Sequence, residues 1–180
     1  MDLQDFESQL LYFDKPMRVE TERLIEAAAE AYGDGNAEPL LLEAYTLEPE
    51  NLSVLVALYR FYYYQHRYPE GVAIAEEVMA VVAPMIHFPE RWQEIEFAHL
   101  ANGVQESFTM VRFYLLALKA QAYLQLRMEN VELGVKMLNK VIELDHKDRL
   151  GAKSLLLAVG PTELRNKSEQ QPKYTAVLAD

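Results

Sequence analysis

The sequence contains no cysteine among its 180 residues, which excludes disulfide bonds, thiolate catalysis and cysteine-ligated zinc. It also contains no apolar run that approaches the ~20 residues a helix needs to cross a bilayer. The first five residues, MDLQD, are acidic where a secretory signal segment would be basic. We therefore expect a cytoplasmic protein.

Positive charge is scarce as well. The chain has 17 lysines and arginines against 28 aspartates and glutamates, a formal net charge of −11. Nucleic acids and anionic membranes are bound by clustered cations, so neither is expected as a partner. The charge instead fits a protein whose partners carry basic segments.

Glycine is rare too, with seven residues, and the segments between them carry apolar residues at spacings of three and four. This is the period of an α-helix, whereas the alternation typical of strands is hard to find. The sequence predicts an all-α fold. The expected helices span about residues 3–13, 19–32, 36–48, 52–66, 69–84, 90–100, 107–128, 130–144 and 148–159.

Three stretches of the chain resemble one another: AEPLLLEAYTLEPE, GVAIAEEVMAVVAP and GVKMLNKVIELDHK. Each begins with a small residue, and apolar residues follow four and seven positions later on the same helical face. A small residue at the head of a helix lets that helix approach the backbone of its neighbour. The first two stretches begin at Ala37 and Gly71, 34 residues apart, and the third begins at Gly134.

This period and spacing resemble the tetratricopeptide repeat (TPR), a family of antiparallel helix pairs stacked into a superhelix. The middle unit matches best. The matching residues are Leu55, Leu58, Tyr59 and Tyr62 in its first helix and Gly71, Ala75 and Pro84 in its second. A weaker match in the first unit involves Leu24, Ile25 and Ala28, with Thr21 where a large aromatic residue is typical. The resemblance covers roughly residues 19–148.

One spacing departs from the family pattern. Gly71 and Gly134 are 63 residues apart, five short of two repeats. We expect a single TPR-like domain over residues 1–160, followed by a polar tail over residues 161–180. Within the domain, residues 85–106 are either a degenerate repeat or an excursion from the stack.

The resemblance implies a concave groove that receives a peptide or protein segment. The residues that would line it are Ser53, Val56, Arg60, Tyr63 and Tyr64, with Glu22 and Glu26 from the first unit. Tyrosine offers a stiff apolar ring and a hydroxyl group at small entropic cost, and arginine can bind a carboxylate or stack on a ring. Alternatively, the tyrosines fill space against an adjacent helix, and the glutamates form a solvated acidic face. If the groove interpretation holds for both sets, its partner is a partly basic amphipathic segment.

Two aromatic residues of the irregular segment raise a similar choice. Phe88 and Trp92 either fix that segment to the stack or form a second, exposed anchor for a partner, since tryptophan is common at interaction hot spots.

Two Glu-x-x-His pairs, Glu96 with His99 and Glu143 with His146, supply half of a ferritin-like di-metal site. The other half would be two further glutamates from separate helices, for which Glu90 or Glu94 could be nominated. Against this hypothesis, the second pair ends a helix. The sequence has no nucleophile elbow, phosphate-binding glycine loop or metalloprotease motif. We expect no catalytic residue, metal or cofactor.

The sequence thus favours a non-catalytic scaffold or chaperone-like adaptor that binds a protein or peptide. The alternative is a self-assembling structural homo-oligomer, because exposed ends of a helical stack can pair. A helical di-metal carboxylate protein is a remote third hypothesis.

Overall fold

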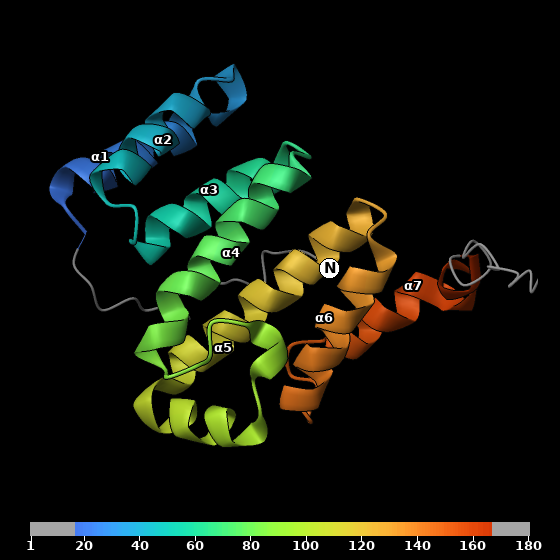
Figure 1. The fold of residues 1–180 in the computed structure, drawn as a ribbon. Helices are drawn as coiled ribbons and strands as arrows, with labels where there is room; N and C mark the ends of the chain where they lie inside the picture. The colour runs from blue at the N-terminus through green and yellow to red at the C-terminus, as the bar shows by residue number, and fades with distance from the viewer. Residues whose placement is uncertain (1–16, 167–180) are drawn as a thin grey trace, which may run out of the picture.

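The computed structural model describes residues 17–166, so the helix predicted over residues 3–13 and residues 167–180 of the predicted tail lie outside it. Within the described part there is no strand, and the all-α prediction is confirmed (Figure 1). The helices are α1 (Val19–Glu30), α2 (Ala37–Leu47), α3 (Leu52–Tyr64), α4 (Tyr68–Met85), α5 (Phe97–Arg127), α6 (Val131–Leu144) and α7 (Ala152–Asn166). Two short 3-10 helices lie in the connections between them: η2 (Ala31–Asp34) between α1 and α2, and η3 (Trp92–Glu94) between α4 and α5.

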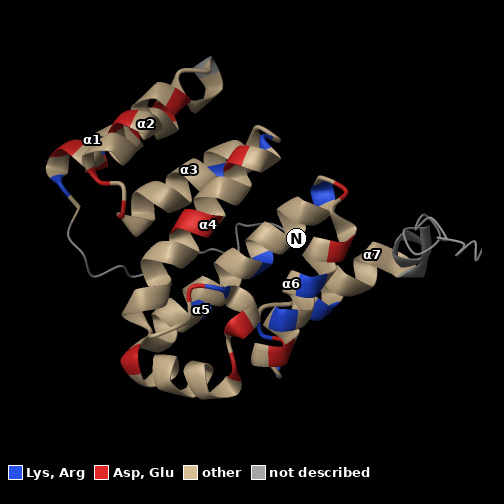
Figure 2. Ribbon diagram, viewed as in Figure 1, with Lys and Arg blue, Asp and Glu red and all other residues tan. Residues whose placement is uncertain are grey.

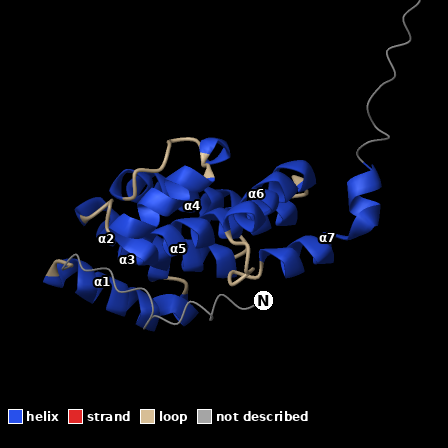
Figure 3. Cartoon of the chain, turned by 90° about the horizontal axis from the view of Figure 1, so that it is seen from below, coloured by secondary structure: helices blue, strands red, loops and turns tan. Residues whose placement is uncertain are grey.

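Consecutive helices lie against one another and run in opposite directions along the chain (Figure 1). Seen from below, they form two layers, with α1, α3, α5 and α7 in one and α2, α4 and α6 in the other (Figure 3). Helices distant in sequence, such as α3 and α5, therefore become neighbours within one layer.

The small residues at the heads of α4 and α6 lie where helices approach closely, as their positions predict. A Cβ atom added to Gly71 would lie 2.9 Å from Leu124 Cδ1 of α5. At Gly134 the fit is tighter, because an added Cβ would lie 2.7 Å from Leu126 Cδ2 and 2.9 Å from the backbone oxygen of Ala122. Glycine at 134 thus allows α6 to pack directly on the backbone of α5.

The segment between α4 and the main part of α5 differs from its prediction. The helix expected over residues 90–100 is wrong for residues 90–96, which form a loop with the single turn η3, and helix begins only at Phe97, the start of α5. Glu96 and His99 cap this start, with the Glu96 backbone N–H donating to His99 Nδ1 at 3.1 Å. The extended backbone of Ser107 (φ −161°, ψ 106°) then separates the first ten residues of α5 from the rest. Figure 1 shows this segment at the lower edge of the molecule; we refer to residues 86–106 as the excursion.

The ends of α4 and α7 also refine the predictions. Pro84 lies inside the last turn of α4, which continues to Met85. The helix predicted to start at Asp148 begins later, at Ala152, although Asp148 Oδ1 accepts a hydrogen bond from the Lys153 backbone N–H in its first turn at 3.0 Å. The predicted stop at Gly160 is a kink with φ 69°, and helix resumes over residues 161–166, which the prediction assigns to the tail.

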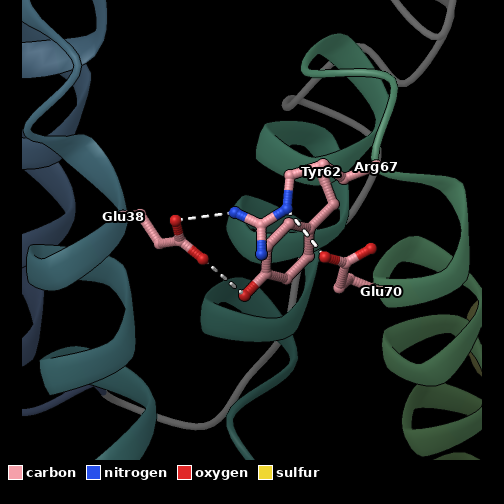
Figure 4. A network of polar contacts seen from close by, with 4 residues as sticks. All are labelled: Glu38, Tyr62, Arg67 and Glu70. Atoms are coloured by element: carbon pink, nitrogen blue, oxygen red, sulfur yellow. Dashed lines mark hydrogen bonds and ion pairs between the residues drawn. The ribbon is translucent and has the colours of Figure 1, made fainter.

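A polar network joins α2, α3 and α4 (Figure 4). The Arg67 guanidinium pairs with Glu38 Oε2 at 2.6 Å and with Glu70 Oε1 at 2.8 Å, and it lies 4.7 Å from the centre of the Tyr62 ring. The Tyr62 hydroxyl donates to Glu38 Oε1 at 3.3 Å. These contacts raise the pKa of Arg67 and lower that of Glu70, so both groups stay charged near neutral pH. The network fixes how the first two helix pairs meet.

Candidate functional site

Two predicted groove residues, Val56 and Arg60, line one narrow pocket between α3, α4 and α5. Its other walls come from Tyr59, Ala75, Val78, Phe113, Ala117 and Ala120. The cavity volume is about 30 Å³, roughly the space of one water molecule. This pocket can accept the tip of a side chain, but it is too small for a whole ligand.

The consecutive tyrosines of α3 lie in different environments. The Tyr63 ring is half-buried and stacks on Tyr59 at 6.2 Å between centroids, and it lies 5.9 Å from Tyr123 of α5. Tyr64 packs edge to face on Tyr63 at 5.3 Å and is 40% exposed. Tyr63 therefore fills the seam between α3 and α5, whereas Tyr64 remains accessible.

Two residues of α5 complete this surface, and the sequence analysis does not identify either of them. Arg127 donates a hydrogen bond from its guanidinium to the Tyr123 hydroxyl at 2.9 Å. The same guanidinium lies 5.1 Å from the centre of the Tyr68 ring. Tyr123 and Arg127 are four residues apart and share one helical face, a signal that is visible once the register of α5 is known. We refer to Arg60, Tyr63, Tyr64, Tyr123 and Arg127 as the α3–α5 face.

Of the remaining predicted groove residues, Ser53 lies two turns before Arg60 on α3, whereas Glu22 and Glu26 lie on α1. Ser53 is half-buried in the first turn of α3, where its backbone N–H donates to the Asn51 side chain at 3.0 Å. Glu22 and Glu26 are exposed on α1, and the described residues show no hydrogen bond, ion pair or ring contact between them and the face. Figure 2 shows acidic residues on α1 and α2 and basic residues on α6. The charges within the face itself belong to two arginines, and Glu22 and Glu26 are not part of it.

Burial raises the pKa of two phenols in this region, those of Tyr59 and Tyr63. For Tyr63, hydrogen bonding to Tyr123 adds to this effect, and the pKa rises to about 12. Hydrogen bonding to Tyr123 raises the pKa of Arg127, so this guanidinium remains charged. The face therefore presents aromatic rings together with the guanidinium groups of Arg60 and Arg127.

These raised values predict a loss of stability at high pH. Tyr63 and Tyr114 have pKa values of about 12 in the folded protein, against an ordinary value of 10.0. The contribution of these two protonated hydroxyl groups to the free energy of unfolding is complete below the pKa of tyrosine in the unfolded chain. It is lost as the pH rises through the pKa of the two tyrosines in the folded protein, because the unfolded chain releases these protons first. We expect the free energy of unfolding, measured in urea, to fall between about pH 10 and pH 12. Constant stability over this range, with all tyrosines titrating together in ultraviolet absorbance, would contradict the assignment.

The second predicted anchor is only partly available. Phe88 is 7% exposed and packs edge to face on Tyr114 at 5.0 Å, so the hypothesis that it is an exposed anchor is wrong. Trp92 is half-buried in η3. Phe88 is therefore one of the residues that fix the excursion to the core.

The two Glu-x-x-His pairs serve other contacts. Glu96 and His99 cap α5, Glu143 pairs with Lys140 at 3.0 Å, and the His146 ring stacks on Phe97 at 6.3 Å. Over residues 17–166 there is no group of three or more histidine, aspartate or glutamate side chains that could hold a metal ion. The described residues therefore provide no ligand set for the di-metal hypothesis.

No helix in the described part of the chain has both the length and the apolar character needed to span a membrane. No protein-family model matches the sequence, and no solved structure matches it. The chain is similar to a protein of Azotobacter chroococcum mcd 1 named "Uncharacterized 19.8 kDa protein in nifW 5'region". The two are 51% identical over 156 residues, which cover 87% of each chain.

Proposed function

This chain belongs to the same family as the uncharacterized 19.8 kDa protein of Azotobacter chroococcum, and we propose that it is a TPR-like scaffold or chaperone-like adaptor. In this proposal it is non-catalytic, acts in the cytoplasm and binds a segment of another protein. Because the relative is itself uncharacterized, the proposal rests on the geometry of the described residues.

The TPR-like part of the proposal is supported by three features. Helices alternate between two layers, small residues recur at the heads of α2, α4 and α6, and those of α4 and α6 meet α5 closely. The excursion between α4 and α5 accounts for the irregular spacing of the third unit. A stack of this kind leaves one layer of helices available for a partner.

The observation that carries the binding function is the α3–α5 face. Tyr64 is accessible beside Arg60, and Tyr123 and Arg127 extend the same surface onto α5. Aromatic residues and arginine are enriched in interaction hot spots, because they combine a large contact area with directed hydrogen bonds. The narrow pocket beside Arg60 adds room for a small apolar group.

The charges of this face specify the partner more narrowly than the sequence does. Two guanidinium groups favour carboxylates, which they can bind through paired hydrogen bonds. We propose a segment that carries apolar or aromatic side chains together with acidic residues, in place of the partly basic segment expected from the sequence.

Self-assembly remains a second candidate because a separate apolar surface is exposed. Phe97 and Phe108 are 64% and 56% exposed on either side of the Ser107 break. Phe108 and Val104 also line a groove of about 590 Å³ that reaches the end of α6. Exposed apolar patches of this kind mark interaction sites, and a second copy of the chain could cover this one. Light scattering separates the candidates, since a stable dimer in the absence of any other protein would favour self-assembly.

The test of the proposed function is the paired replacement of Arg60 and Tyr64. Loss of partner binding with the fold intact is the expected result.

A further inference from the structure

The groove of about 590 Å³ lies between the N-terminal part of α5, the end of α6 and the loop that leads to α7. Most of the residues that line it are apolar, and two of them, Val104 and Phe108, are 41% and 56% exposed. Phe97, which is 64% exposed, stacks on the lining residue His146 at 6.3 Å. Apolar surface of this extent is unfavourable in water, so the groove is suited to being covered by another segment.

The charged residues that line this groove are mostly cationic, although the chain has a formal net charge of −11. Arg112, Lys147 and Arg149 stand against a single carboxylate, that of Asp145. Asp145 Oδ2 already accepts a hydrogen bond from the Leu150 backbone N–H at 2.8 Å. Among the described residues, none of the three cations forms an ion pair. The groove is therefore a locally positive site on an acidic protein, and it favours an apolar segment that carries carboxylates.

The chain itself contains a segment of this chemistry outside the described residues. Residues 2–14, DLQDFESQLLYFD, include four acidic side chains and no basic one. In the helix predicted over residues 3–13, four apolar residues share one face because their spacings are three, four and three: Leu3, Phe6, Leu10 and Phe13. The segment therefore combines an apolar stripe with negative charge, which complements the groove in both respects.

The connection to α1 is long enough for this segment to reach α5 of the same molecule. Phe13 is six residues before Val19, where α1 begins, and an extended connection of this length spans about 20 Å. α1, α3 and α5 lie in one layer (Figure 3), and packed helices are about 8–10 Å apart, so α5 is about 16–20 Å from α1. A tethered segment also has a high effective concentration at any site within its reach.

We propose that residues 2–14 dock in this groove of their own molecule. The apolar face of the segment covers Val104 and Phe108, and its carboxylates lie beside Arg112, Lys147 and Arg149. The groove is separate from the α3–α5 face, so this inference does not rest on the proposed scaffold function. It assigns the groove to the chain itself in place of a second copy.

Disulfide crosslinking tests the docking in the full chain, which has no cysteine of its own. The test variant combines Leu10→Cys in the segment with Val104→Cys in the groove. The matched control combines Leu10→Cys with Leu42→Cys, since Leu42 is 43% exposed but lies on α2. Under mild oxidation we expect the groove pair to form a disulfide within one molecule at least about tenfold faster than the control pair, because the bond requires Cα atoms within ~7 Å.

Charge variants test what holds the segment in place. Adding Arg112→Glu and Lys147→Glu to the groove pair is expected to slow crosslinking at least about threefold at low salt, with a smaller effect at high salt. Adding Asp5→Lys and Glu7→Lys to that variant is expected to restore the rate. A general loss of stability would not be restored in this way, and the melting temperature of each variant provides a second check on the fold.

Equal rates in the groove and control pairs, or no disulfide in the groove pair, would overturn the proposal. A disulfide that forms only between two molecules would assign the groove to a second copy and would also overturn it. The same holds if the charge reversals leave the rate unchanged, or if the lysine substitutions fail to restore it.

Discussion

Replacing Arg60 and Tyr64 together by alanine is expected to weaken binding of the partner protein at least about tenfold, the usual consequence of removing two hot-spot residues. The two side chains are exposed, and Tyr64 extends from the aromatic seam that Tyr63 forms with Tyr123. Because they are exposed, we expect the melting temperature to remain close to that of the wild type. The measurement is co-purification of the partner from cell extract, quantified against the wild type.

The chain supplies a control for each part of this experiment. Tyr32 is 39% exposed, matching the 40% of Tyr64, but it lies in η2 beside Phe61, so Tyr32→Ala is expected to leave binding unchanged. Tyr63→Ala is unsuitable as a binding variant, since its ring packs on Tyr59 and Tyr123 and its removal is expected to lower stability. Equal loss of binding in Tyr32→Ala and in the double variant would contradict the assignment of the α3–α5 face.

The second large effect is expected at Gly134. In an open helical position, alanine is about 1 kcal/mol more favourable than glycine. At Gly134 the added Cβ would lie 2.9 Å from the Ala122 backbone oxygen and 2.7 Å from two atoms of Leu126, so α6 must move away from α5. Overpacking of this kind costs about 1–3 kcal/mol and more where backbone must shift, so we expect a net loss of about 2 kcal/mol in the free energy of unfolding of Gly134→Ala.

Gly33→Ala is the matched control for this substitution. A Cβ at Gly33 would meet nothing within 4 Å, so the variant is expected to be as stable as the wild type or slightly more stable. Denaturant unfolding of both variants tests the packing of α6 on α5. If Gly134→Ala were as stable as Gly33→Ala, the close approach of these helices would be contradicted.

Local signals predict most of the fold, because helix ends depend on residues near in sequence. Asn51 accepts a hydrogen bond at the start of α3, Asp148 does so for α7, and the chain turns where Gly35 adopts a left-handed conformation. The prediction of a helix fails over residues 90–96, where the spacing of Trp92 and Ile95 resembles that of a helical face. Ile95 is fully buried, and its carbonyl accepts from Lys140 of α6 at 3.1 Å, so tertiary contacts hold this stretch as a loop.

The site was predictable on one helix only. The spacing on α3 identifies Arg60, Tyr63 and Tyr64, but it cannot tell which ring is covered by another helix. Tyr123 and Arg127 share one face of the helix predicted over residues 107–128, but no local pattern shows that this face packs beside Tyr63 of α3. The acidic groove expected from Glu22 and Glu26 depends on the placement of α1 relative to α3, which no local pattern determines.

The most direct test of the proposed binding function is site-specific photo-crosslinking in cells. A photoreactive phenylalanine analogue is placed at position 64 in one strain and at position 32, with matched exposure, in another. The scaffold function predicts an adduct with a different protein from position 64 and none from position 32. The same adducts from both positions, no adduct from position 64, or only adducts between copies of this chain would contradict it.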